Sequence, residues 1–180
     1  DIKYFSGSAT YSKQFEISNL KSQILLDLGT VHAIAKVRLN GQEIATLWKE
    51  PYRTDVTSAL RLGTNTLEVE VINTWHNRLV GDRQPGATPG TFTTSNPVNA
   101  NTPLQPSGLI GPVRFLAPVS GVQVAIPLPD AGFENPTTST YQYNPTGASW
   151  TFSGNSGITR NASGFTYANP PAPEGLQVAF

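Results

Sequence analysis

The feature that most limits the fold of this chain is a strict two-residue alternation of apolar and polar side chains. Leu67, Val69 and Val71 alternate with two glutamates, and residues 9–17 and 33–39 alternate in the same way. Helical periodicity over ten or more residues appears nowhere in the sequence. Because successive side chains of a strand point to opposite faces of a sheet, the pattern predicts half-buried strands and an all-β protein.

Turn signals between these runs favour antiparallel pairing. Asn40-Gly41 separates the run 33–39 from a return run at 42–48. Both central residues of a two-residue hairpin turn need positive φ, which asparagine and glycine tolerate. Glycine and proline are frequent, at 16 and 15 residues, so many turns are expected. The spacing of the strands is typical of an antiparallel β-sandwich.

Composition argues against several partners and sites. Twelve basic residues balance twelve acidic ones without a basic run, so neither nucleic acid nor an anionic membrane is expected as a partner. No apolar run approaches the roughly 18 residues of a membrane span. Cysteine is absent, which rules out disulfides and cysteine-ligated metals.

The abundance of Thr, Asn, Gly and Pro favours a bacterial secreted or periplasmic protein. No signal peptide opens the chain, so we expect a mature or trimmed piece.

Aromatic and polar groups gather where two strands are expected to end. The candidate ligand-binding residues of these two clusters are Trp48, Tyr52, Arg53, Trp75, Asn77, Arg78 and Asp82. An aromatic ring can stack on the apolar face of a pyranose, while guanidinium, amide and carboxylate groups hydrogen-bond to its hydroxyls. If the fold brings the strand ends together, the two clusters predict a sugar site.

A structural interpretation of the same residues stands beside this one. A tryptophan in a β-sandwich is often part of the core, so Trp48 and Trp75 are each either core residues or sugar platforms. Arg78 would then pair with Asp82 or with backbone carbonyls. The aperiodic, proline-rich segment 76–108 that follows is either a lid over the cluster or disordered.

Catalytic patterns are missing from the sequence. Glycoside hydrolysis needs two carboxylates facing each other, roughly 5–9 Å apart. The acidic residues mostly lie on strand faces that are expected to be solvated: Asp27, Asp55, Glu68 and Glu70. There is no nucleophile elbow or phosphate-binding loop, and two histidines are too few for a histidine-rich metal site. We therefore expect a protein that is not an enzyme by itself.

Most of residues 1–118 resembles a known family. The segments that carry the resemblance are YFSGSATYSKQFEI (4–17), residues 26–60, LGTNTLEVEVINTWHNRLVGD (62–82) and SGLIGPVRF (107–115). They resemble the galactose-binding-like jelly roll of family-2 type glycoside hydrolases, most closely the version at the C-terminal end of bacterial α-L-rhamnosidase-like enzymes. The family usually has Trp-Pro-Asn-Arg where this chain has Trp-His-Asn-Arg, so no role is assigned to His76.

The remaining residues resemble the opening of a second galactose-binding-like module of secreted bacterial proteins. The segments are IPLPDAGFENP (126–136), residues 144–165 and APEGLQVAF (172–180). This resemblance implies that Glu134 helps to hold a structural calcium ion, with Asp130 nearby; the alternative is a solvated turn carboxylate.

The expected domains are a jelly roll at 1–122 and a partial β module at 123–180. About 55 residues cannot close an independent sandwich. The second module should therefore pack on the first or on another chain, which would allow self-association through the C-terminal segment.

These observations favour a non-catalytic carbohydrate-binding module of a larger secreted glycoside hydrolase of the α-L-rhamnosidase type. Its expected partners are a polysaccharide or oligosaccharide and the parent catalytic domain. The alternative is a scaffold that braces the catalytic domain and binds no sugar.

Overall fold

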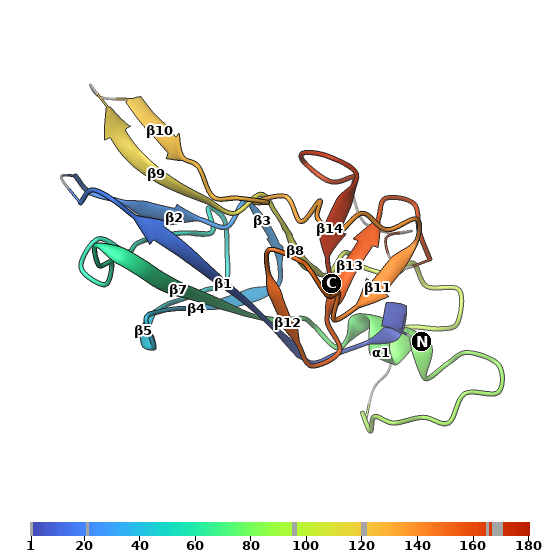
Figure 1. Ribbon diagram of the computed structural model, residues 1–180. Coiled ribbons are helices and arrows are strands. Elements are labelled where there is room, and N and C mark those ends of the chain that lie inside the picture. Colours follow the sequence, from blue (N-terminus) through green and yellow to red (C-terminus); the bar gives the residue numbers. More distant parts are fainter. Residues whose placement is uncertain (1, 21, 95–96, 120–121, 165, 167–170) are drawn as a thin grey trace.

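The computed structural model of the protein describes residues 2–20, 22–94, 97–119, 122–164, 166 and 171–180. Two antiparallel sheets face each other and form a β-sandwich (Figure 1). The five-stranded sheet has the order β12 (Thr151–Ser153), β1 (Ser8–Ile17), β7 (Gly63–Ile72), β4 (Ile34–Leu39) and β5 (Gln42–Leu47). The four-stranded sheet has the order β10 (Val122–Ile126), β9 (Arg114–Val119), β2 (Leu25–Asp27) and β6 (Arg53–Asp55). The prediction of an all-β antiparallel sandwich is confirmed.

Smaller elements complete the described part of the chain. A three-stranded sheet has the order β11 (Tyr141–Tyr143), β13 (Gly157–Arg160) and β14 (Gln177–Ala179). A two-stranded sheet pairs β3 (Thr30–His32) with β8 (Gly108–Gly111). The helical elements are the 3₁₀ turn η1 (Ile2–Tyr4) and the short helix α1 (His76–Gly81). Neither is long and apolar enough to cross a membrane.

The alternating pattern of the sequence sets the faces of the five-stranded sheet. Tyr11 of β1 lies opposite Val69 of β7, which lies opposite Val37 of β4, and all three side chains are fully buried. On the outer face, Lys36 and Glu70 form an ion pair at 3.8 Å. The turn between β4 and β5 has positive φ at both central residues, 53° at Asn40 and 80° at Gly41, as the hairpin signal predicts.

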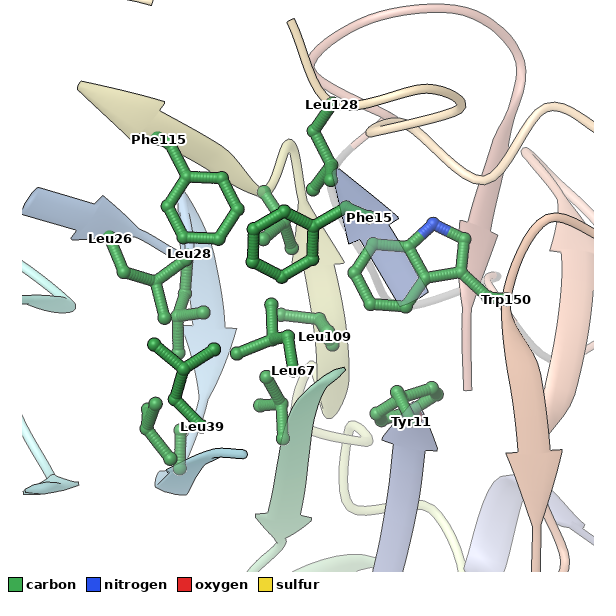
Figure 2. Close-up of a cluster of buried hydrophobic side chains, with 14 of the residues drawn as sticks. Tyr11, Phe15, Leu26, Leu28, Leu39, Leu67, Leu109, Phe115, Leu128 and Trp150 are labelled. Atoms are coloured by element: carbon green, nitrogen blue, oxygen red, sulfur yellow. The ribbon is translucent and has the colours of Figure 1, made fainter. Parts of the chain in front are cut away.

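One hydrophobic core fills the space between the sheets. Figure 2 shows leucines of β2, β4 and β7 meeting Phe15 from β1 and Phe115 from β9. The rings of Phe15 and Phe115 have centroids 4.6 Å apart, which joins the two sheets directly. Close packing of this kind holds the strand ends, and the loops that leave them, in fixed positions.

The C-terminal segment packs on the first sandwich. β12 pairs with β1 and extends the five-stranded sheet. Trp150 is 2% exposed, as expected for a core residue, and its ring lies 5.0 Å from that of Phe133. The segment also covers Lys13 of β1, whose ammonium donates to the Ser149 carbonyl at 2.8 Å. The tail and the sandwich therefore share one core, and the expected division at residues 122 and 123 falls inside β10.

Reciprocal hydrogen bonds join the first and the last of the three segments that carry the second resemblance, 126–136 and 172–180. Glu134 Oε1 accepts the backbone N–H groups of Leu176 and Gln177 at 2.9 and 2.7 Å. The Gln177 amide in turn donates to the carbonyls of Phe133 and Pro136. A Cβ at Gly175 would lie 2.2 Å from the Glu134 carboxyl carbon, so the close approach requires glycine.

Two local features differ from the expectations drawn from the sequence. The aperiodic segment after β7 begins with helix α1, which at six residues is too short to produce a periodic pattern. The apolar residues of the stretch 108–116 predict one strand with Val113 and Phe115 inward, but the stretch divides into β8 and β9, which pair with β3 and β2 respectively. Val113 and Phe115 nevertheless point into the core as expected.

Candidate functional site

An open groove of about 440 Å³ lies where β3, β5 and β7 end. We call it the Trp48 groove, and its lining residues are Val31, His32, Ala33, Trp48, Tyr52, Asn73, Thr74, Gln105 and Pro106. Trp48 directly follows the last residue of β5, where the chain leaves the sheet, and the residue is 68% exposed. The Lys49 ammonium lies 5.5 Å from the centroid of its ring. The indole is therefore available to a ligand in the groove, in line with the sugar-platform interpretation of Trp48.

Tyr52 supports the groove from within the protein. Its side chain is 6% exposed, and its hydroxyl donates to the Ala33 carbonyl at 2.8 Å. Burial, followed by the nearby Glu50 carboxylate, raises the pKa of this hydroxyl above its ordinary value. Tyr52 thus lies in the core beneath the groove, and its ring is not an open stacking surface.

His32, Asn73, Thr74 and Gln105 line the groove although the sequence analysis does not single them out. His32 Nε2 is shielded from solvent and makes no hydrogen bond within the described part of the chain. Burial lowers the pKa of the imidazole, and the Glu50 carboxylate opposes that shift. Asn73 and Thr74 could have been found, since they directly precede Trp75 at a strand end. No sequence signal points to His32 or Gln105.

Arg53 lies in a neighbouring depression together with Asp27 and Glu50. Its guanidinium pairs with Asp27 Oδ2 at 2.7 Å, and Asp27 Oδ1 accepts the Gly29 N–H at 2.9 Å. Glycoside hydrolysis needs one carboxyl group to act as proton donor and the other as nucleophile or base. In this depression the Asp27 carboxylate is thus engaged by Arg53 and by the backbone of Gly29.

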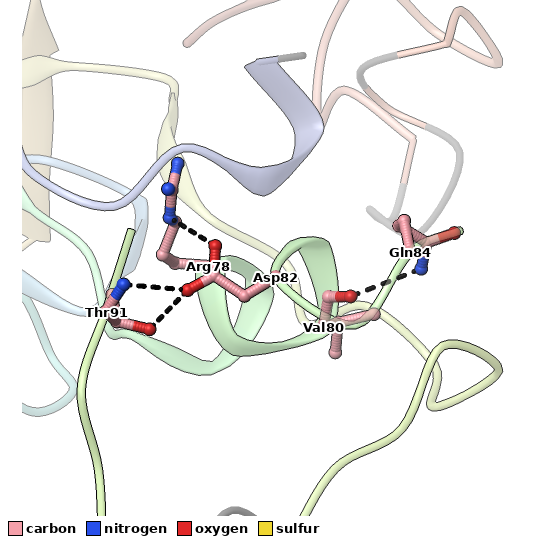
Figure 3. A network of polar contacts seen from close by, with 5 residues as sticks. All are labelled: Arg78, Val80, Asp82, Gln84 and Thr91. Carbon is pink, nitrogen blue, oxygen red and sulfur yellow. Dashed lines mark hydrogen bonds and ion pairs between the residues drawn. The ribbon is translucent and has the colours of Figure 1, made fainter. Parts of the chain in front are cut away.

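Arg78 and Asp82 form a closed polar corner with Thr91 (Figure 3). Arg78 Nε lies 3.0 Å from Asp82 Oδ1, while Asp82 Oδ2 accepts the Thr91 N–H at 2.9 Å and the Thr91 hydroxyl. Burial by itself would raise the pKa of Asp82. The hydrogen bonds from Thr91 and Gly90, together with Arg78, hold it below its ordinary value. We call these residues the Asp82 corner; the pairing is the one that the structural interpretation predicts.

Asn77 holds the segment that leads into β8 through side-chain hydrogen bonds. Its side-chain amide donates to the Gln105 carbonyl and accepts the Gln105 N–H, both at 2.8 Å. His76 Nε2 lies 2.9 Å from the Pro103 carbonyl oxygen and supports the same segment. Trp75 is 60% exposed, so it is not a core residue, yet it is not among the residues that line the Trp48 groove. The seven candidate residues are thus divided, with Trp48 and Tyr52 at the groove and the others elsewhere.

The carboxylates expected to hold calcium are mostly engaged by the protein. Glu134 Oε1 accepts two N–H groups, as described above, and Asp130 Oδ1 accepts the Asn135 N–H at 3.0 Å. Asp130 Oδ2 is buried and has no hydrogen-bond partner among the described residues, and burial raises the pKa of this carboxyl group. Within the described ranges, no three His, Cys, Asp or Glu side chains gather as a metal site. Calcium binding at Glu134 and Asp130 stays a prediction.

Comparison with known proteins relates most of the chain to glycoside hydrolases. The family described as glycosyl hydrolase 2 galactose-binding domain-like matches residues 3–102. A protein of Formosa agariphila named putative beta-glucuronidase is 54% identical over 87 residues, which are 46% of this chain and 8% of that protein.

One solved structure supports the same relationship to glycoside hydrolases. A rhamnosidase from Novosphingobium sp. PP1Y matches with a TM-score of 0.60 and 50% identity, over 63% of this chain and 11% of that chain. A beta-glucuronidase from an uncultured Clostridium is 31% identical over 39% of this chain and 13% of that chain, with a TM-score of 0.37. The chain thus spans only a small part of the relatives that it matches.

Proposed function

The chain belongs to the glycosyl hydrolase 2 galactose-binding domain-like family, and from this premise we propose that it is a non-catalytic carbohydrate-binding module of a glycoside hydrolase. We place its sugar site in the Trp48 groove. The module would hold a polysaccharide or oligosaccharide for a catalytic domain elsewhere in the same enzyme.

The exposed indole of Trp48 is the observation that carries this proposal. The Trp48 side chain is 68% exposed and forms part of the groove wall, so its ring is open to a sugar that stacks on it. Thr74 and Gln105 lie in the same lining, where their polar side chains can orient the hydroxyls of a stacked sugar. Asn73 also lines the groove, but its amide is engaged by the backbone of Phe5 and Gly7. The groove volume of about 440 Å³ falls within the usual range of small-ligand sites.

The fixed position of the groove supports binding with little loss of entropy. Tyr52 is held by its bond to Ala33, and Asn73 is held by the backbone of Phe5 and Gly7 at 3.1 and 2.9 Å. Asn77 holds the backbone of Gln105. Since these residues are already ordered, a ligand need not order them, which favours affinity.

Affinity electrophoresis against polysaccharides that contain rhamnose, galactose or xylose tests the proposal. We expect retardation by at least one polysaccharide, and Trp48→Ala to weaken that binding by about tenfold or more because the stacking surface is lost. Trp75→Ala is the matched control, since this indole is similarly exposed but lies outside the groove lining. Equal binding by wild type and Trp48→Ala, or no binding to any polysaccharide, would overturn the proposal.

Docking to a catalytic domain is a second candidate function, favoured by Phe92. This side chain is 85% exposed, and it follows Thr91, which the Asp82 corner holds in place. If docking is the function, Phe92→Ala lowers the melting temperature of the intact enzyme and leaves that of the separate module unchanged. Leu62→Ala, at another exposed apolar residue, is the control.

A further inference from the structure

We infer that the Trp48 groove selects a neutral sugar over a sugar acid. The inference rests on the proposed function, because it names the class of ligand that the same groove would take. The names of two relatives make the choice concrete, since a glucuronidase acts on a sugar acid and a rhamnosidase on an uncharged sugar.

The lining of the groove is polar but carries no formal charge. Its polar side chains are those of His32, Tyr52, Asn73, Thr74 and Gln105, and none of the described lining residues is Lys, Arg, Asp or Glu. The Tyr52 hydroxyl and the Asn73 amide are engaged within the protein. A carboxylate that leaves water without a cationic partner loses hydration that neutral donors restore only in part. Proteins therefore commonly bind carboxylates with arginine or lysine. The hydroxyls of a neutral sugar have no such requirement.

The imidazole of His32 is the one lining group that could become a cation. Its Nε2 is shielded from solvent and lacks a hydrogen-bond partner within the described ranges, so a proton added there would be poorly solvated. Burial lowers the pKa of the His32 imidazole, and the Glu50 carboxylate raises it by less, so the pKa is lowered overall. At neutral pH the groove therefore has a neutral imidazole in its wall.

The charged groups around the groove, as far as the structure describes them, lie outside its lining. The Glu50 carboxylate acts on both His32 and Tyr52 and would repel an acidic ligand. The Arg53 guanidinium lies in the neighbouring depression and is paired with Asp27. Lys49 is the remaining basic group, and its ammonium lies over the Trp48 ring, where a stacked sugar would compete with it.

Calorimetric titration with matched glycosides tests the inference. Methyl β-D-glucopyranoside and methyl β-D-glucuronide differ only in whether carbon 6 is an alcohol or a carboxylate, and the galactose and galacturonic acid glycosides form a second pair. At pH 7 we expect the neutral member of at least one pair to bind about tenfold or more tightly than the acid. Trp48→Ala should remove the binding of the neutral glycoside.

Two variants test how one added or one removed lysine changes the affinity for the acidic glycoside. Gln105→Lys adds a cation to the lining while its backbone bonds to Asn77 remain available, so it should raise the affinity for the acid by about threefold or more. Lys49→Ala should not weaken the binding of the acid, because the inference gives this ammonium no role in holding a carboxylate.

The outcomes distinguish this inference from the proposed function. Equal or tighter binding of the acid by wild type, or loss of acid binding in Lys49→Ala, would overturn the inference and leave carbohydrate binding intact. If neither member of either pair binds and no polysaccharide retards the protein, both the inference and the proposed function fail.

Discussion

The Trp48 groove and the Asp82 corner both lie beyond the ends of strands of the five-stranded sheet but have opposite characters. The groove lies where β5 and β7 end, and the corner is formed at the short helix α1 that follows β7. In the Asp82 corner, Arg78 and Thr91 engage both carboxylate oxygens, and the side chain is 7% exposed. In the groove, the Trp48 indole faces solvent, and the lining carries no formal charge within the described ranges.

The difference lies in where the hydrogen bonds of each cluster go. A polar group that finds a partner within the protein stabilises the fold and has little left to offer a ligand. Asp82, Arg78 and Asn77 have such partners, and their bonds hold the segment after α1. Trp48 is left with its ring exposed at the groove, so a ligand has a surface there on which to stack.

The largest expected effect is a loss of stability when Tyr52, the core residue beneath the Trp48 groove, is replaced. Tyr52→Ala should lower the free energy of unfolding by about 3–5 kcal/mol, because it leaves a cavity and removes the hydrogen bond to Ala33. Urea denaturation measures the change. Trp48→Ala serves as the control and should change stability by no more than about 0.5 kcal/mol, since its ring is exposed. A Tyr52→Ala variant as stable as wild type would place this ring outside the core and weaken the comparison.

A smaller loss of stability is expected at the Asp82 corner. Asp82→Ala should lower the free energy of unfolding by about 1–3 kcal/mol, because Arg78 and Thr91 lose a buried partner. Limited proteolysis should also cut the segment 83–94 faster, while sugar binding at the groove stays unchanged.

Glu70→Ala is the matched control for the corner. It removes a more exposed ion pair with Lys36 and should cost less than about 1 kcal/mol. Equal effects of the two substitutions would mean that the Asp82 corner does not stabilise the segment.

The smallest effect is the acid dependence of the corner. The pKa of Asp82 is lowered in the folded protein, so its contribution to stability is complete above the ordinary value of 3.8 and is lost as the pH falls through the folded pKa. Urea denaturation at pH 7 and at about pH 3 should show a steeper acid loss for wild type than for Asp82→Asn. Asp55, whose pKa is lowered by hydrogen bonds from Gln23 and Thr57, adds a similar dependence that remains in the variant. Identical losses of stability at low pH in wild type and Asp82→Asn would contradict the stabilising role given to the Asp82 carboxylate.

The strands were more predictable than the site because their signal is local. The alternation in β1, β4 and β7 and the Asn40-Gly41 turn anticipate the five-stranded sheet, since each depends on neighbours in sequence. Trp48 was also anticipated as a candidate. His32 and Gln105 were not, because they reach the groove through the pairing of β3 with β8 and through the bonds of Asn77. Those contacts join residues far apart in the chain.

The sequence by itself determined the strand faces, the hairpin turn and the lack of long helices. It also determined which residue types could bind a sugar. Only the tertiary structure decided which of them remain available. Thr91 lies 9 residues from Asp82, Gln105 lies 28 residues from Asn77, and Leu176 lies 42 residues from Glu134 along the chain. A polar side chain becomes structural when folding brings such a partner within hydrogen-bond distance, and no local pattern specifies that approach.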